Sequence, residues 1–182
     1  MKLNISKNRE DKKYPPIIQF KRVLWGGGRI LFRVIPRPFY KPRRMLLRLF
    51  GAKVGSHVNI SNTACIYFPW NLEIGDWSSI GDYVYVYNLG KITIGKESTI
   101  SHKSHLCAGS HDYTVPDLPL LKPSIIVEDQ AWICADSFVG PGVHISQGAV
   151  IGARSVVNKD VESWVVVAGN PAKYINKRKL SI

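Results

Sequence analysis

Residues 127–157 read VEDQAWICADSFVGPGVHISQGAVIGARSVV and place an aliphatic residue at every sixth position. These residues are Val127, Ile133, Val139, Ile145, Ile151 and Val157. A helix repeats every 3.6 residues and a strand every 2, so a period of six requires a unit that turns a corner and returns to the same face. We therefore predict an all-β solenoid in which three hexads form a triangular coil and the aliphatic residue points inward.

The same period extends upstream, with interruptions. Three earlier runs can be aligned to it: Val54, Ile60 and Ile66; Ile74, Ile80, Val86 and Ile92; and Ile94, Ile100 and Leu106. Together the runs predict about five coils stacked at about 4.8 Å. The proline-containing stretch 107–126 is expected to leave the solenoid as a loop. Glycine often follows the inward residue, as at Gly75 and Gly81, and is expected to permit unusual backbone angles at tight corners. An evenly spaced β-sandwich is the alternative.

The formal charge of +12 is unevenly distributed along the chain. Residues 1–50 contain fourteen Lys or Arg and two acidic residues, whereas residues 51–182 contain eleven of each. We therefore divide the chain into a basic, apolar N-terminal arm (1–50), a solenoid domain (51–172) and a basic C-terminal tail (173–182).

The arm mixes bulky apolar residues with cations, and residues 43–50 have the spacing of a short amphipathic helix. No apolar run reaches the roughly 18 residues of a spanning helix, and no secretory signal is recognisable. The composition suits an anchor on anionic lipid, while the alternative is a cap on the open solenoid end. No nucleic-acid-binding motif accompanies the charge, so no nucleic-acid partner is expected. Three cysteines without CxxC spacing favour a reducing compartment, and hence a cytoplasmic protein or one peripheral on the inner membrane face.

Four further segments carry a family resemblance: RLFGA at 48–52, LCAGSHDY at 106–113, AWI at 131–133 and VAGNPA at 167–172. With the hexads, they resemble the hexapeptide-repeat acetyltransferases, and most of all the colanic acid biosynthesis O-acetyltransferases, over residues 25–177. The resemblance implies a left-handed parallel β-helix, although general topology favours right-handed crossovers. It also implies a homotrimer with active sites at subunit interfaces, and acetyl transfer from acetyl-CoA to a sugar hydroxyl in surface polysaccharide biosynthesis.

His111 is the candidate catalytic residue, because it matches the catalytic histidine of that family. A sugar hydroxyl is too weak an acid to attack a thioester unaided, and an imidazole can accept its proton near neutral pH. We expect direct transfer in a ternary complex, with an unidentified donor stabilising the oxyanion. The alternative is a surface loop histidine. His102 and His105 do not match the ligand spacing of γ-class carbonic anhydrases, so no metal is expected.

The resemblance also implies a coenzyme A site between neighbouring subunits, against the C-terminal coils. By position, the expected cofactor contacts are Trp132, Ala135, Ala153, Asn158 and Lys159. Small side chains at Ala135 and Ala153 would let pantetheine approach the backbone. Lys159, Lys173 and Lys177 could pair with the phosphates of the coenzyme, although each could equally be an ordinary solvated lysine.

The acceptor is expected to be a glycan or glycolipid. The candidate contacts are Asp82, Tyr85, Tyr87, Asn88 and Tyr113, with Asp117 on the same loop. Soluble maltose and galactoside acetyltransferases have an asparagine where this chain has Asp82, so a small free sugar fits poorly. Two alternatives remain: a transferase of this fold acting on a nucleotide-linked amino sugar or an antibiotic, and a noncatalytic binding solenoid.

Overall fold

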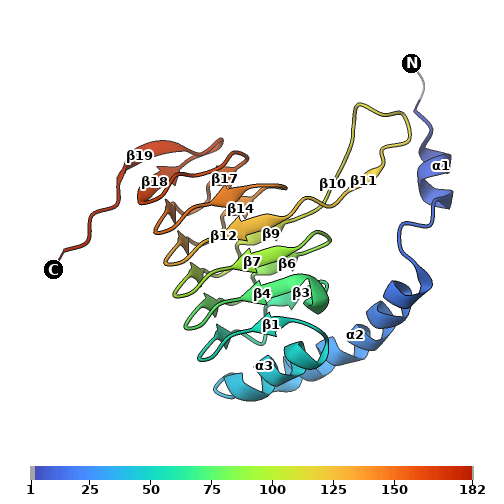
Figure 1. Cartoon of the computed structure of the whole chain (residues 1–182), viewed down its shortest axis with the longest axis horizontal. Coiled ribbons are helices and arrows are strands. Elements are labelled where there is room, and N and C mark those ends of the chain that lie inside the picture. The colour runs from blue at the N-terminus through green and yellow to red at the C-terminus, as the bar shows by residue number, and fades with distance from the viewer. Residues whose placement is uncertain (1–2, 182) are drawn as a thin grey trace.

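The computed structural model describes residues 3–181 and contains a parallel β-solenoid of about six turns with helices at its N-terminal end (Figure 1). The predicted solenoid is thus confirmed. The sequence predicted about five coils, and the structure has about six. The first sheet contains β1 (Lys53–Val54), β4 (Leu72–Ile74), β7 (Ile92–Ile94), β12 (Ile125–Val127) and β15 (His144–Ile145). The second sheet contains β2 (Asn59–Ile60), β5 (Ser79–Ile80), β8 (Thr99–Ile100), β13 (Trp132–Ile133), β16 (Val150–Ile151), β18 (Val165–Ala168) and β19 (Lys173–Lys177). The third sheet contains β3 (Cys65–Ile66), β6 (Tyr85–Tyr87), β9 (His105–Cys107), β14 (Phe138–Val139) and β17 (Val156–Val157).

Inward aliphatic residues form ladders in all three sheets, and the first sheet has a second ladder of Leu72, Ile92 and Ile125. In the second sheet the register aligns Ile60, Ile80, Ile100, Ile133 and Ile151, one in each successive coil. All six aliphatic residues at 127–157 are buried, none more than 2% exposed. The stacked ladders form the continuous core that the period predicts. Burial of each such side chain stabilises the fold by about 1.5–3 kcal/mol.

Glycine after the inward residue has a different role from the one expected. Gly75 and Gly81 are not among the positive-φ residues, and the left-handed conformation falls two positions later, at Trp77 (φ 62°) and Tyr83 (φ 58°). A Cβ on Gly75 would lie 2.7 Å from the carbonyl carbon of Gly95 in the next coil, and one on Gly81 would lie 2.9 Å from the amide nitrogen of His102. The prediction of unusual backbone angles at these glycines was wrong: they allow neighbouring coils to approach closely.

Three helices precede the solenoid: α1 (Ile5–Glu10), α2 (Pro16–Val34) and α3 (Tyr40–Leu49). α2 and α3 lie across its N-terminal end, whereas α1 lies beside the loop that leaves the third sheet (Figure 1). The indole Nε1 of Trp25 donates to the carbonyl of Ile66 at 2.9 Å, and Leu47 is fully buried. α2 continues through Gly26–Gly28. Among residues 3–181, no helix has both the length and the hydropathy to cross a bilayer.

Arg43 of α3 is also fully buried at this end. Its guanidinium donates to the carbonyls of Ile60 at 2.8 Å, Pro36 at 2.8 Å and Arg37 at 2.7 Å. A buried cation is tolerated where backbone acceptors satisfy its donors. Arg43 therefore ties the connection between α2 and α3 to the first coil.

Candidate active site

His111 lies on a hairpin that projects from the solenoid between β9 and β12 (Figure 1). Its strand β10 (Ser110–His111) pairs antiparallel with β11 (Leu120–Leu121), and the imidazole is exposed. Nδ1 lies 2.7 Å from the carbonyl oxygen of Leu118. Because a carbonyl only accepts hydrogen bonds, this contact assigns the proton to Nδ1 and leaves the lone pair of the neutral ring on Nε2.

Asp112 stabilises the turn that follows His111. Its Oδ1 accepts from the amide of Thr114 at 2.9 Å and from the hydroxyl of Thr114 at 2.5 Å. These two hydrogen bonds hold the pKa of Asp112 below its usual range, and the bond from the Thr114 hydroxyl is the larger cause. This carboxylate is therefore ionised near neutral pH and engaged within the loop.

The loop is also held by α1. The side-chain amide of Asn8 donates to the carbonyls of Asp117 at 2.7 Å and Leu118 at 2.6 Å. Lys7 pairs with the carboxylate of Asp117 at 2.9 Å, and the hydrogen bond from Lys7 is the main cause of the lowered pKa of Asp117. Asp117 was expected near the acceptor, and the structure joins it to the arm. The role of Asn8 could not be predicted from the sequence, because no local pattern indicates a contact across 110 positions.

Tyr85 and Tyr87, two predicted acceptor contacts, lie together on the outer face of the third sheet. Their ring centroids are 5.9 Å apart, and Tyr67 lies 5.0 Å from Tyr87. We call Tyr67, Tyr85 and Tyr87 the tyrosine wall. Tyr87 approaches the hairpin: its Cε1 would lie 3.1 Å from a Cβ placed on Gly109. The tyrosine wall therefore reaches the segment that carries His111.

His105 also borders the tyrosine wall, with its ring centroid 5.0 Å from that of Tyr85. Burial lowers the pKa of His105, so its imidazole is neutral near pH 7. Its Nε2 is buried and has no hydrogen-bond partner within the described part of the chain. The ring therefore contributes an uncharged surface to this face.

Asp82 and Asn88, two other predicted acceptor contacts, are engaged within the protein. Asp82 accepts hydrogen bonds from the hydroxyls of Ser61 and Thr63 and pairs with Arg37 at 2.9 Å. The Ser61 contact is the largest cause of its lowered pKa. Asn88 is fully buried and makes two hydrogen bonds with the backbone of Phe68. Its Oδ1 accepts from the Phe68 amide at 2.8 Å, and its Nδ2 donates to the Phe68 carbonyl at 2.5 Å. Both side chains thus stabilise turns of the solenoid.

Tyr113, the remaining acceptor candidate, is 86% exposed on the projecting loop. Its side chain is therefore free to meet a ligand approaching the hairpin.

Three predicted cofactor residues line one cavity of about 700 Å³ at the C-terminal end: Asn158, Lys159 and Lys173. Ala135 and Ala153 occupy the same corner in successive coils, where the amide of Arg154 donates to the carbonyl of Ala135 at 2.9 Å.

Trp132 and Lys177 lie elsewhere on the second sheet. Trp132 is 45% exposed and donates through Nε1 to the Ser101 hydroxyl at 3.0 Å. Lys177 lies opposite Val165 in the antiparallel β18–β19 pair. Of the seven predicted cofactor residues, three therefore share a cavity and two share a corner, whereas Trp132 and Lys177 lie on strands separated by β16 and β18.

The three cysteines are free, and burial raises the pKa of Cys107. Its thiol is therefore protonated at neutral pH, which disfavours a nucleophilic role. Within residues 3–181, no group of three or more His, Cys, Asp or Glu side chains is arranged to hold a metal.

Known proteins are similar in sequence to this chain, although no protein-family model matches it. The chain is 44% identical to WcaF of Escherichia coli (strain K12) over 154 residues, 85% of each chain; WcaF is provisionally named a colanic acid biosynthesis acetyltransferase. The chain belongs to the hexapeptide-repeat acetyltransferases. It is also 27% identical over 140 residues to WbbJ of the same organism, covering 70% of this chain and 68% of WbbJ. WbbJ is provisionally named a lipopolysaccharide biosynthesis O-acetyl transferase. The family resemblance is thereby confirmed.

Solved structures support the fold of this hexapeptide-repeat acetyltransferase. A hexapeptide-repeat-containing acetyltransferase from Vibrio cholerae, complexed with acetyl coenzyme A, superposes with a TM-score of 0.83 over 95% of each chain, at 24% identity. A maltose O-acetyltransferase from Clostridium difficile 630 also gives 0.83, covering 91% of this chain and 90% of that one, at 24% identity. The predicted parallel β-helix is the fold of these proteins.

Proposed function

We propose that this hexapeptide-repeat acetyltransferase moves an acetyl group from acetyl-CoA to a sugar hydroxyl of a surface polysaccharide or its precursor, with His111 as the general base. The observation that carries the proposal is the hydrogen bond between His111 Nδ1 and the Leu118 carbonyl, which leaves a lone pair on Nε2. The 44% identity to WcaF supports the reaction class and the glycan acceptor.

The chemistry is direct transfer in a ternary complex. Nε2 of His111 takes the proton of the sugar hydroxyl as its oxygen attacks the thioester carbonyl. This attack forms the new C–O bond and a tetrahedral oxyanion, and collapse of the oxyanion re-forms the carbonyl, breaks the C–S bond and leaves the acetyl ester. The imidazolium then returns its proton to the departing thiolate of coenzyme A. No acyl-enzyme is needed, in keeping with the protonated thiol of Cys107.

For the cosubstrate, the cavity lined by Asn158, Lys159 and Lys173 is the proposed end of the coenzyme A site. Two lysines near one cavity suit the phosphates of the coenzyme. Trp132, Ala135, Ala153 and Lys177 are proposed to contact the cofactor along the neighbouring coils. A homotrimer with active sites between subunits belongs to the same proposal, and sedimentation equilibrium would test it.

The decisive experiment measures coenzyme A release and product mass with glycan acceptors, a nucleotide-linked amino sugar and an antibiotic. We expect acetylation of a glycan and a loss of about 100-fold or more in kcat for His111→Ala. His102→Ala is the matched control, because His102 precedes the hairpin. Unchanged transfer by His111→Ala would remove His111 from this role. Acetylation of only the amino sugar or the antibiotic would show that the acceptor is not a glycan. Failure to bind acetyl-CoA would favour a noncatalytic solenoid.

We also propose that the arm holds the enzyme on an anionic membrane, at the cytoplasmic face. One side of α2 is entirely apolar and faces away from the solenoid. Its large residues are between 50% and 75% exposed: Ile17, Phe20, Val23, Leu24, Ile30, Leu31 and Val34. At 100° per residue they fall within a band of about 140°, which we call the α2 stripe.

Charge favours a membrane as the occupant of the α2 stripe. The surplus of twelve positive charges in residues 1–50 would attract anionic lipid at about 1 kcal/mol for each Lys or Arg near the surface. The apolar side chains would then enter the boundary between headgroups and acyl chains.

Vesicle flotation tests this attachment. We expect binding to vesicles with 30% phosphatidylserine, weakening as salt rises, and loss of binding in Val23→Glu/Ile30→Glu. Leu180→Glu, an exposed apolar position outside the arm, is the control. Equal binding to neutral vesicles would show that the positive charge of the arm does not contribute to membrane attachment. A change of oligomeric state without any vesicle binding would instead assign the α2 stripe to a second copy of the chain.

A further inference from the structure

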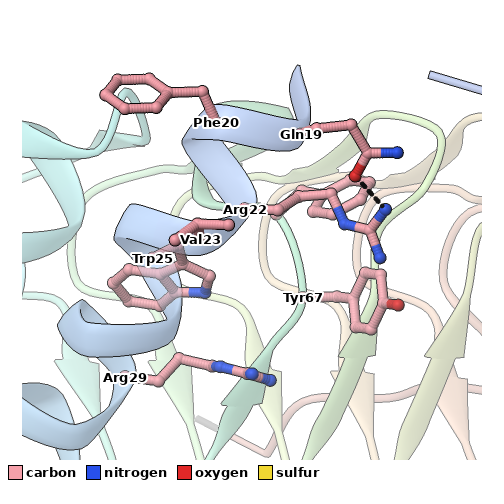
Figure 2. A pocket seen from close by; sticks show the side chains of 8 residues that line it. Gln19, Phe20, Arg22, Val23, Trp25, Arg29 and Tyr67 are labelled. Atoms are coloured by element: carbon pink, nitrogen blue, oxygen red, sulfur yellow. Dashed lines mark hydrogen bonds between the residues drawn. The ribbon is translucent and has the colours of Figure 1, made fainter. Parts of the chain in front are cut away.

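Two arginines of α2 point away from the α2 stripe, toward the third sheet. Figure 2 shows Arg22 and Arg29 extending to the same side of the helix as Tyr67. Arg22 Nη1 donates to Gln19 Oε1 at 2.8 Å, and its guanidinium carbon lies 5.1 Å from the ring centroid of Tyr14. In the described part of the chain, neither arginine has a carboxylate within 4.0 Å. Two positive charges therefore face one surface without a protein counterion.

These arginines line a pocket of about 400 Å³ between α2 and the third sheet. Tyr67 lies on the side to which both arginines extend (Figure 2). The other lining residues are Gln19, Trp25 and Phe68, with Phe20 and Val23 from the border of the α2 stripe. Phe68 also lies under Arg22, at 5.8 Å from the guanidinium carbon to the ring centroid. The pocket thus combines two guanidinium groups with flat aromatic surface.

The tyrosine wall continues from this pocket toward the hairpin. Burial raises the pKa of both Tyr85 and Tyr87, and the charge of Arg29 opposes this rise at Tyr85 while that of Arg22 opposes it at Tyr87. Tyr67 provides the geometric link, because it lines the pocket together with both arginines and its ring centroid lies 5.0 Å from that of Tyr87. Because Tyr87 also reaches Gly109, one continuous surface joins the two arginines to the His111 segment.

We propose that this pocket binds the phosphate or diphosphate of a glycosyl phosphate acceptor, through Arg22 and Arg29, and that the attached sugar lies along the tyrosine wall toward His111. The proposal rests on the proposed function, since it assigns the acceptor of that reaction. Guanidinium groups bind phosphate oxygens through paired N–H donors. The flat faces of the tyrosines suit the apolar faces of sugar rings.

A glycosyl diphosphate could come from a nucleotide or from a lipid carrier. The α2 stripe favours the lipid, because the helix that offers the arginines would lie at the depth of the headgroups if its apolar side enters the membrane. A lipid-linked diphosphate would then meet Arg22 and Arg29 with its chain still in the bilayer. We therefore expect the prenyl diphosphate sugar to be the better acceptor.

The test compares four acceptors with one sugar: the free sugar, its 1-phosphate, its nucleotide diphosphate and its prenyl diphosphate in detergent. For Arg22→Gln/Arg29→Gln we expect the KM of every phosphate-bearing acceptor to rise about tenfold or more. The KM values for the free sugar and for acetyl-CoA should not change. Arg22→Lys/Arg29→Lys should recover part of the loss, and Lys41→Gln, an exposed cation of α3, is the charge-matched control. Circular dichroism and thermal unfolding check that each variant folds.

Calorimetry with inorganic pyrophosphate gives a readout independent of transfer. If pyrophosphate binds to the wild type and not to Arg22→Gln/Arg29→Gln, but the wild type transfers acetyl to none of the acceptors, the phosphate site is supported and the proposed function is contradicted. Transfer that Arg22→Gln/Arg29→Gln does not alter, or alters equally for the free sugar, would overturn the phosphate site and leave the proposed function standing. A lower KM for the nucleotide-linked sugar than for the prenyl-linked one would overturn the lipid source alone.

Discussion

Asn8 and His111 share one hydrogen-bond acceptor, the carbonyl oxygen of Leu118, at 2.6 Å from Asn8 Nδ2 and 2.7 Å from His111 Nδ1. The first helix therefore fixes the carbonyl that orients the proposed general base. Leu118 itself has a φ of 46°, an uncommon conformation for a residue with a side chain. Contacts from both sides hold this carbonyl in place.

Loss of the Asn8 amide should lower transfer without unfolding the solenoid. We expect Asn8→Ala to reduce kcat about three- to tenfold, because a carbonyl freed from one donor holds the imidazole less firmly. Nitrogen NMR of labelled histidine should show a larger share of the other tautomer for His111. Asn176→Ala, on the outer strand β19, is the control. An unchanged tautomer and kcat would show that Asn8 serves the loop backbone only.

Gly27 and Gly28 are neighbours in α2 with opposite expected responses to alanine. A Cβ on Gly28 would lie 2.7 Å from Trp25 Cε3 and 2.8 Å from Phe50 Cε2, whereas one on Gly27 would meet nothing within 4 Å. Gly28→Ala should therefore destabilise the protein by about 1–3 kcal/mol through overpacking. Gly27→Ala should stabilise it by up to about 1 kcal/mol through helix propensity. Urea unfolding measures both, and equal effects would mean that α2 does not pack on the solenoid as described.

The sequence predicted those parts of the molecule that depend on local spacing. The ladder through Ile133 and Ile151 follows from the hexads, because each inward residue is buried by its equivalents in adjacent coils. The same pattern could not show that Asn88 is buried, since its hydrogen-bond partner, the backbone of Phe68, lies 20 residues away in the neighbouring coil. Nor could it connect Asn8 with Leu118, because contacts between distant segments depend on how the arm folds back.

Arg43 should be among the most sensitive positions of the arm. Arg43→Met leaves the carbonyls of Ile60, Pro36 and Arg37 without this donor in a buried site, and we expect a loss of about 2–4 kcal/mol in the free energy of unfolding. Arg44→Met is the matched control: Arg44 is half-buried and donates to the carbonyl of Val58 at 2.9 Å, so its loss should cost about 1 kcal/mol. Guanidinium unfolding would distinguish the two. Similar losses would show that water replaces the Arg43 donors.

Glu73 should make the stability of the first sheet depend on pH. Lys53 at 2.7 Å and Lys91 at 2.9 Å hold the pKa of Glu73 below its usual range, with the Lys53 hydrogen bond the larger cause. A depressed pKa contributes stability that is fully present above the unfolded value, about 4.3, and is lost as pH falls through the folded value. Both lysines are largely exposed, so the contribution at pH 7 is about 1 kcal/mol or less.

Glu73→Gln should therefore be less stable than the wild type at pH 7, and the difference should shrink as the pH falls below about 4. Adding 0.5 M salt should also reduce it, because exposed ion pairs are screened. Glu162→Gln, at an exposed site without an ion pair among residues 3–181, should show neither trend. Urea unfolding of the three proteins between pH 3 and 7 provides the measurement. A difference that grows as pH falls would mean that protonated Glu73, rather than its carboxylate, is the form the fold favours.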